Sequence, residues 1–358
     1  MIERCCRRGH VKQLDRPARG HNIQRSTLKT SRESSRRFAG ARSGRVSDPR
    51  AEVRAAPRYR RSAMATDVAP PSDGPDFAKM GIYVDGRLKN ELDELLKTKS
   101  SSDVTARDVY AMSCMHYLDD DPMRQAAEYF GLATAGEDGG SAGPRKILDF
   151  GAGFAGDARV MAEDFPGCEL TCVEVQPHIH AAAQNFTDML HASDRCKHAC
   201  VDVFENDVPG APFDHLFSVL AILHVPQRDL LWTRLAENLK PGGTVYVEDY
   251  FARRPLTDQD KAQLAGPVAC PYLPSEDEYL ATLASRGFVD VRWETMNDRW
   301  EPFVESRLEG FRAARERHLR VHGESLVGEL DLFYSTVREL FARGNLGGVR
   351  IRARLGGA

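Results

Sequence analysis

One short stretch, ILDFGAGFAGD at residues 147–157, constrains the fold of this chain more than any other part of the sequence. The run KILDF predicts a buried strand, and Gly151, Gly153 and Gly156 follow it as G-x-G-x-x-G before the helical stretch DARVMAEDF. Glycines at these points let the backbone turn tightly and approach a ligand closely, and we expect Gly156 to let the helix pack against the strand. The motif therefore predicts a nucleotide-type site in an α/β fold.

Strands and helices alternate after this motif, which predicts a parallel sheet covered by helices on both faces. The fold class is thus a Rossmann-like, doubly wound sheet of seven strands, with N-terminal helices and a helical insertion before the last strand. The predicted strands are the apolar runs at 145–151, 169–175, 196–204, 214–222, 244–251, 288–296 and 347–355.

Changes in composition divide the chain into segments. Residues 1–76 read as a disordered basic presequence and linker, residues 77–144 as an N-terminal helical cap, and residues 145–358 as the main domain. Within that domain we expect residues 298–346 to form a helical lid over the ligand edge of the sheet.

The N-terminal segment carries most of the positive charge. Residues 1–63 hold 18 Lys and Arg against 5 Asp and Glu, and they are rich in serine. This composition is typical of a mitochondrial or plastid transit peptide, and without such a peptide we expect a cytoplasmic protein. A disordered nucleic-acid tail, or upstream sequence outside the working protein before Met64, remains an alternative.

Three further features bear on possible partners. The body of the chain is acidic, which argues against nucleic acid as a partner, and no apolar run is long enough to span a membrane. The eight cysteines include no C-x-x-C pair, so we expect neither a disulfide framework nor a metal site. His178 and His180 start a helix and face different directions, which makes a metal site there improbable.

Three stretches together resemble the class I S-adenosylmethionine-dependent methyltransferases: ILDFGAGFAG, VEVQ with Glu174 at the end of the second strand, and LAENLKPGGTVYVEDY. The glycine motif and Glu174 alone fit NAD equally well, whereas the third stretch has no counterpart in a dinucleotide-binding fingerprint. The resemblance implies a seven-stranded sheet with an antiparallel last strand and S-adenosylmethionine as cofactor. The residues expected to line the cofactor are Asp149, Gly151, Gly153, Gly156, Glu174, Asp202, Val203 and Leu220.

Within that family, residues 217–251 are most similar to the small-molecule N-methyltransferases of phosphoethanolamine or of sarcosine and dimethylglycine. The resemblance implies a small-molecule methyl acceptor, with His224 and Tyr250 as catalytic residues. His224 is the candidate base, because a histidine can take a proton from an amine near neutral pH. Tyr110, Tyr117 and Asp249 are the residues expected to contact the acceptor, although the helical spacing around the two tyrosines also fits core packing.

One position departs from this pattern. The relatives carry an acid where this chain has Leu220, and that acid helps to hold a cationic amine. Either Glu248 or Asp249 replaces it, or the acceptor is a thioether acid or an oxygen nucleophile. A protein methyltransferase, an NAD(P) oxidoreductase and a non-catalytic cofactor-binding relative are more remote alternatives.

Overall fold

The computed structural model describes residues 85–132 and 144–357, and every structural statement below concerns these residues. The chain divides into a unit of residues 1–64 and a unit of residues 65–358, and the described residues belong to the second. The basic presequence predicted for residues 1–76 lies outside them, as does the start of the predicted cap. No helix in the described part is long and apolar enough to cross a membrane.

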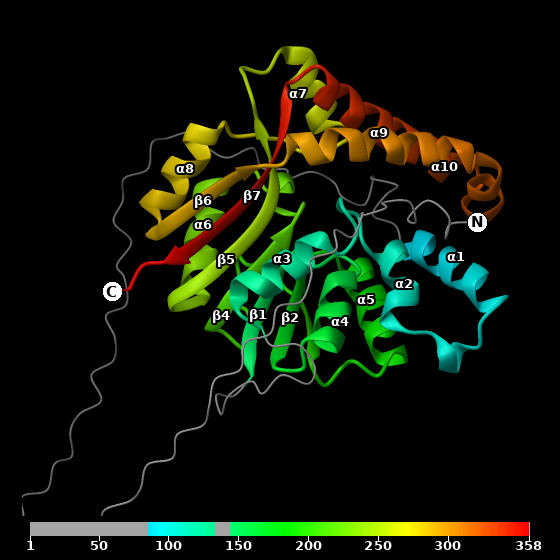
Figure 1. The fold of residues 1–358 in the computed structure, drawn as a ribbon, viewed down its shortest axis with the longest axis horizontal. Coiled ribbons are helices and arrows are strands. Elements are labelled where there is room, and N and C mark those ends of the chain that lie inside the picture. Colours follow the sequence, from blue (N-terminus) through cyan, green and yellow to red (C-terminus); the bar gives the residue numbers. More distant parts are fainter. Residues whose placement is uncertain (1–84, 133–143, 358) are drawn as a thin grey trace, which may run out of the picture. The chain divides into compact units, whose positions relative to one another are not determined.

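A single mixed sheet forms the centre of the described unit (Figure 1). Its strand order is β3-β2-β1-β4-β5-β7-β6; β1 to β5 are parallel, and β7 runs antiparallel to both β5 and β6. The strands are β1 (Arg145–Phe150), β2 (Cys168–Glu174), β3 (Cys196–Cys200), β4 (Phe213–Val219), β5 (Leu239–Ala252), β6 (Phe288–Thr295) and β7 (Leu346–Leu355). The predicted seven-stranded, doubly wound sheet with an antiparallel last strand is confirmed.

Helices cover both faces of this sheet. The helices are α1 (Asp85–Leu96), α2 (Ala106–Ser113), α3 (Asp121–Phe130), α4 (Gly156–Asp164), α5 (Pro177–Met189), α6 (Arg228–Glu237), α7 (Asp258–Ala265), α8 (Glu276–Ser285), α9 (Asn297–Ala313) and α10 (Arg315–Ala342). Leu148 and Val245 pack with Trp232 of α6 on one face of the sheet. Ile147, the residue before Leu148, packs with Met161 of α4 on the other face of the sheet. Burial on both faces explains why the central strands are almost continuously apolar.

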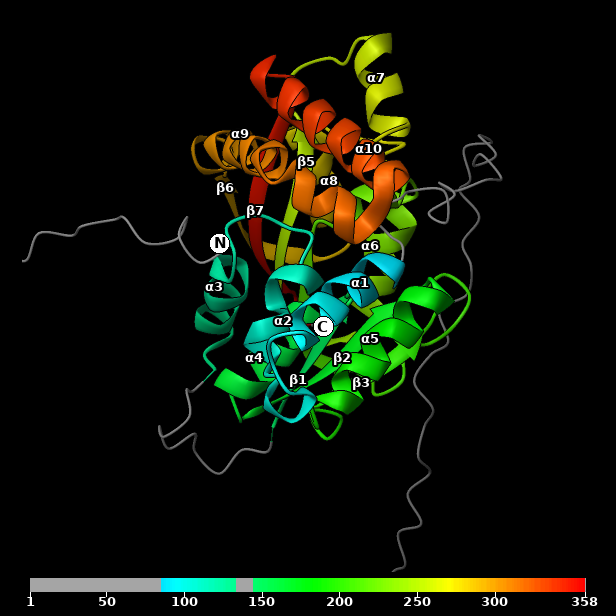
Figure 2. The same ribbon diagram turned by 90° about the vertical axis from the view of Figure 1, so that its right-hand side faces the viewer.

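The segment between β6 and β7 holds two long helices, α9 and α10, which lie beyond the same end of the strands in both views (Figures 1 and 2). Trp300 of α9 and Phe341 of α10 both contact the ring of Tyr250 in β5. A side chain at Gly348 of β7 would come within 2.1 Å of the Trp300 ring, so this glycine lets α9 approach the sheet. Within α10 the backbone departs from helical geometry at Gly323, where φ is 80°.

Three local features mark the ends of the helices. The N-cap of α2 is Thr105, which forms a capping box with Asp108. The helix α6 ends at Glu237, and the Lys-Pro-Gly-Gly segment at residues 240–243 lies within β5. The helices α7 and α8 were not predicted, although Thr257 and Ser275 form capping boxes at their starts.

Candidate active site

The glycine-rich loop joins β1 to α4 at the carboxyl end of the sheet. Gly151 and Gly153 have φ values of 69° and 54°, which residues other than glycine rarely adopt. A Cβ atom on Gly151 would lie 2.3 Å from the Cβ of Ala221, the residue two beyond the end of β4. A Cβ atom on Gly156 would lie 2.5 Å from the Sγ of Cys114. Gly156 therefore makes room for the segment after α2, and the expected packing of Gly156 against the strand is wrong.

A cavity of about 360 Å³ opens beside this loop. Its lining includes all eight residues that were predicted to hold the cofactor: Asp149, Gly151, Gly153, Gly156, Glu174, Asp202, Val203 and Leu220. They come from the ends of β1, β2 and β4 and from the segment after β3. Three strand ends and a glycine loop thus converge on one space that can take a ligand of nucleoside size.

Glu174 fixes the shape of this cavity at the end of β2. Its carboxylate accepts hydrogen bonds from the backbone N–H groups of Gly153, at 3.2 Å, and Gln176, at 2.9 Å. Burial raises the pKa of Glu174, and these two N–H groups oppose the increase. A carboxylate held at this point can also accept hydrogen bonds from the two ribose hydroxyls of an adenosine. The residues present therefore fit S-adenosylmethionine.

A second group of polar side chains lines the same cavity and was missed by the sequence analysis. His116 Nε2 lies 2.7 Å from Asp157 Oδ2, and Cys114 lies beside this pair. Burial lowers the pKa of His116, but the charges and hydrogen bonds of Asp157 and Cys114 together outweigh burial and raise that pKa well above its usual value. A protonated His116 places a positive charge near Asp149. No spacing motif marks His116, because it follows α2 and reaches the cavity only through the tertiary fold.

A smaller cavity, of about 20 Å³, adjoins the first. Its lining is mostly apolar and consists of Met115, Tyr117, Leu220, Leu223, His224, Tyr250, Val268 and Phe333. Met115, Leu220 and His224 line both cavities. The structure thus brings three of the predicted acceptor-side residues together, and the hydroxyls of Tyr117 and Tyr250 are hydrogen bonded to each other.

His224 lies at the junction of the two cavities, in a single 3₁₀ turn after β4. Its Nδ1 is 2.8 Å from the carbonyl oxygen of Ala269. A carbonyl can only accept, so Nδ1 carries the proton and Nε2 carries the lone pair. Burial lowers the pKa of His224 to about 4, which keeps the ring neutral at pH 7. A neutral imidazole thus lies where the two cavities meet.

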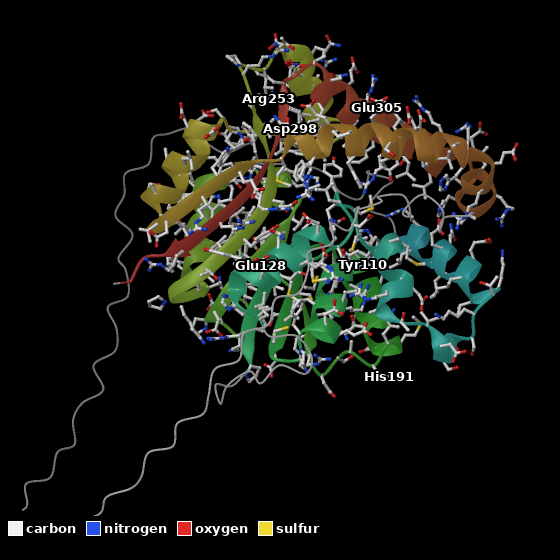
Figure 3. The ribbon with its side chains drawn as sticks, viewed as in Figure 1. Tyr110, Glu128, His191, Arg253, Asp298 and Glu305 are labelled. Carbon is white, nitrogen blue, oxygen red and sulfur yellow. The ribbon has the colours of Figure 1, made fainter. Side chains whose placement is uncertain are left out.

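The structure places two of the predicted acceptor-side residues outside both cavities. Asp249 lines neither cavity; it is fully buried on the opposite face of β5 from Tyr250, where it accepts hydrogen bonds from Arg228 at 2.9 Å and from Tyr279 at 3.0 Å. Neighbouring residues of a strand point to opposite faces, which is why Tyr250 and Asp249 separate. Tyr110 also lines neither cavity, and its hydroxyl donates to Asp157 at 2.7 Å beside α4 (Figure 3).

Glu248, the other acid considered as a replacement at position 220, is buried among structural partners. Arg350 of β7 donates to its carboxylate at 2.8 Å and Tyr246 donates at 2.7 Å. Arg350 in turn reaches Asp121 of α3 at 2.6 Å. Glu248 therefore ties β5, β7 and α3 together and does not line either cavity.

Comparison with known proteins agrees with this geometry. Residues 148–245 match the model of a family described as a methyltransferase domain. Phosphoethanolamine N-methyltransferase 2 of Caenorhabditis elegans is 28% identical over 162 residues, which are 44% of this chain and 36% of that protein. The chain therefore spans well under two thirds of the length of this relative.

Two solved structures share the fold. Phosphoethanolamine N-methyltransferase 2 of Haemonchus contortus, in complex with phosphomonomethylethanolamine and S-adenosylhomocysteine, superposes with a TM-score of 0.60 at 21% identity, covering 73% of this chain and 59% of that one. A sarcosine dimethylglycine methyltransferase assigned in Galdieria sulphuraria superposes with a TM-score of 0.57 at 17% identity, covering 66% and 85%. Residues 148–245 therefore match a methyltransferase domain, and the sheet of the described unit shares the fold of these solved methyltransferases.

Proposed function

We propose that this chain transfers a methyl group from S-adenosylmethionine to a small acceptor that reacts at the second cavity. One observation carries the proposal: Met115, Leu220 and His224 line both cavities. The smaller cavity has room for about one water molecule as it stands, so only the reacting end of an acceptor would enter it and meet the donor at these three side chains. The larger cavity carries the carboxylates and backbone groups that suit an adenosine, and the smaller one is mostly apolar.

Methyl transfer from S-adenosylmethionine mainly requires the protein to position the two reactants. S-adenosylmethionine supplies a methyl group on a positively charged sulfur; the acceptor's lone pair forms the new bond, and the old carbon–sulfur bond breaks to leave a neutral thioether. Holding the two reactants in line contributes ~7 to 11 kcal/mol toward such a barrier. Leu220, Leu223 and Val268 exclude water from the junction, while His224 and the two tyrosine hydroxyls offer hydrogen bonds that orient the acceptor.

An amine is the first candidate for the acceptor. The similarity to phosphoethanolamine and sarcosine methyltransferases supports it, as does the position of His224. Because the pKa of His224 is lowered to about 4, this residue is too weak a base to hold a proton taken from an ammonium group. The amine would have to arrive deprotonated, and the proton that it loses after methyl transfer would go to solvent.

A thioether acid is the second candidate, and a specific observation favours it. None of the described residues that line the second cavity carries a carboxylate. Leu220 occupies the acidic position of the amine methyltransferases, and both acids that could have replaced it are buried elsewhere. A thioether has no proton to lose, so it needs no base at the reacting atom, and its carboxylate would lie outside this apolar lining.

The test is release of S-adenosylhomocysteine by the full chain across amines, methylated glycines, phosphobases, thioether acids and phenols. Turnover that His224→Ala lowers ~100-fold or more would support methyl transfer with this residue at the acceptor. Binding of S-adenosylhomocysteine without turnover on any class would contradict the proposal in favour of a non-catalytic relative. Binding of NAD without S-adenosylhomocysteine would contradict it entirely.

Leu220→Asp, with Leu220→Asn as its matched control, separates the two acceptor classes. Position 220 has a φ of 49°, which Asp and Asn tolerate well, so neither variant should strain the backbone. If the acceptor is an amine that carries an N–H group, Asp should raise kcat/KM relative to Asn, because its carboxylate accepts a charge-assisted hydrogen bond from the developing ammonium. If the acceptor is a thioether acid, the sulfonium product is equally cationic but has no N–H group, and the substrate carboxylate is repelled, so Asp should not raise kcat/KM relative to Asn.

A further inference from the structure

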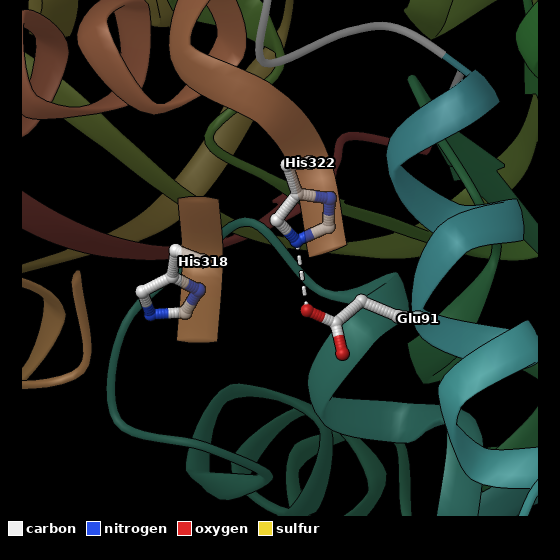
Figure 4. A group of neighbouring side chains, drawn as sticks. All are labelled: Glu91, His318 and His322. Carbon is white, nitrogen blue, oxygen red and sulfur yellow. Dashed lines mark hydrogen bonds and ion pairs between the residues drawn. The ribbon is translucent and has the colours of Figure 1, made fainter. Parts of the chain in front are cut away.

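The described part of the chain contains a second cluster of polar side chains well apart in sequence from the motif loop. His318 and His322 lie one turn apart on α10, just before its kink at Gly323, and Glu91 faces them from α1 (Figure 4). Figure 4 shows the three side chains pointing toward a common space between the two helices. The proposed methyl transfer uses none of these residues.

The geometry of this cluster is compact, and its three residues are partly buried. His322 Nε2 lies 2.8 Å from Glu91 Oε1, and one atom from each of the three side chains lies within 4.8 Å of the other two. The side chain of His322 is 2% exposed and that of Glu91 is 15% exposed. The Nδ1 atom of His318 is buried and has no hydrogen-bond partner, and a nitrogen of this ring is turned toward the other two residues in Figure 4. A buried ring nitrogen without a partner is costly unless a ligand satisfies it.

We propose that Glu91, His318 and His322 bind a divalent transition-metal ion, with Zn²⁺ the best fit. Two histidines at positions i and i+4 of a helix present their rings on one face, which is a common arrangement for zinc. Two imidazoles and one carboxylate form a donor set that suits Zn²⁺, whereas Ca²⁺ and Mg²⁺ prefer oxygen ligands alone. Water would take the fourth position.

Arg317 gives the site a supporting partner and also limits its affinity. Its guanidinium forms two hydrogen bonds with the Glu91 carboxylate, at 2.9 and 2.6 Å, which fix the orientation of that group. Hydrogen-bonded carboxylates are typical of the shell around a metal ligand. The positive charge of Arg317 opposes a cation, so we expect micromolar rather than nanomolar binding. The ion would replace the hydrogen bond between His322 and Glu91, and the displaced proton would go to solvent.

An ion at this position would connect two segments that flank the cavities. Arg87 of α1 donates to the sulfur of Met115 at 2.6 Å, and Met115 packs in the same apolar cluster as Leu319 of α10. Met115 lines both cavities. An ion that bridges α1 and α10 would therefore fix the position of Met115 in the walls of the two cavities.

The experiment titrates the full chain, first stripped with a chelator, with Zn²⁺ by calorimetry and with Co²⁺ by visible absorption. His318→Phe is the main variant: it keeps the ring that stacks on Phe311 but removes the ring nitrogens. The control is His191→Asn, an exposed histidine away from α10 in Figure 3, whose φ of 53° asparagine tolerates. We expect one ion per chain with the wild type and the control, and at least a tenfold weaker affinity with His318→Phe.

Three results would overturn the proposal. The first is the absence of stoichiometric binding by the wild type at 100 μM ion, on the order of the weakest affinity a specific site would show. The second is equal affinity in His318→Phe and wild type, provided that both melt at the same temperature without metal. The third is a thiolate-to-cobalt charge-transfer band that Cys114→Ser abolishes, because it would assign the ion to the cluster of Cys114, His116 and Asp157 in the larger cavity. The first two results would leave the methyl-transfer proposal unaffected, since that proposal uses neither Glu91 nor the α10 histidines.

Discussion

The two cavities of this molecule meet at three side chains but differ in almost every other respect. The larger one is lined by backbone of the glycine loop, by carboxylates at strand ends and by His116 paired with Asp157. The smaller one is lined by aliphatic and aromatic side chains, a pair of tyrosines and a neutral histidine. Under the proposed function this difference is a division of roles: the first region would bind the polar donor through fixed charges, and the second would exclude water around the reacting atom.

The two cavities also differ in the elements that hold their walls in place. The larger cavity is built on β1, β2 and β4 and on the turn that follows β1, all close together in the sheet. The smaller one receives Phe333 from α10 and Val268 from the segment after α7, which are far away in sequence. Changes in the first region should therefore alter binding of the cofactor, and changes in the second should alter turnover alone.

The largest effect should come from Gly151→Ala. The added methyl group would lie 2.3 Å from the Cβ of Ala221, and the residue would keep a φ of 69°. Strain and overpacking together should weaken S-adenosylhomocysteine binding by roughly 100-fold, measured by calorimetry. The control is Gly131→Ala, which has a similar φ of 67° but no atom within 4 Å of the new carbon, and should lower only the melting temperature. Unchanged affinity in Gly151→Ala would remove the loop from the cofactor site.

Glu174→Gln should weaken S-adenosylhomocysteine binding by about tenfold or more, because hydrogen bonds to a charged group contribute ~1.5 to 3 kcal/mol. The amide keeps the size of the side chain and one acceptor oxygen for the N–H groups of Gly153 and Gln176. KM for the acceptor should stay within about twofold. A rise in the acceptor KM with unchanged cofactor affinity would break the division between the two regions.

Tyr250→Phe should lower kcat/KM by about 3- to 10-fold and leave S-adenosylhomocysteine affinity unchanged. The substitution removes the hydroxyl that bonds to Tyr117, a loss of about 1 kcal/mol, without altering the packing on Trp300. Tyr279→Phe is the matched control, because its hydroxyl bonds to Asp249 on the other face of the sheet. Equal losses of kcat/KM in the two variants would mean that Tyr250 acts through stability alone.

The smallest effect should be a difference in pH dependence between the two regions. The folded-state pKa of His224 lies below its unfolded value, so the unfolded chain binds the proton first and stability falls as pH drops from 6.5 toward 4. The folded-state pKa of His116 is raised, so its contribution is complete below pH 6.5 and is lost as pH rises through the folded pKa.

Urea unfolding at pH 5, 7 and 9 tests both signs. His224→Gln should reduce the loss of stability between pH 7 and 5 by about 2 kcal/mol. His116→Gln should instead reduce the loss of unfolding free energy above pH 7. If both variants change the same side of the profile, the electrostatic contrast between the cavities is wrong.

The sequence predicted one region far better than the other. The strand, the glycine spacing and Glu174 at the next strand end are local patterns whose geometry follows from few choices, and all eight predicted residues line the larger cavity. Asp249 was misplaced because the motif gives a residue's position on β5 but not the face it occupies, which is decided by α6 and α8 packing on that side. His116 could not be predicted, since only tertiary folding brings the segment after α2 to the cavity.

The position of β7 has a consequence for synthesis of the chain. It is the last strand in sequence, yet it lies between β5 and β6, and β6 has no other strand partner among the described residues. Until residues 346–355 leave the ribosome, the edge of β5 that later pairs with β7 has no partner along most of its length. The segment that carries α9 and α10 is not yet joined to the sheet through β7. The glycine loop and its neighbouring strands β1 to β4 are complete much earlier. The nascent protein would thus spend this interval with an aggregation-prone edge, which is the stage at which a chaperone would matter most.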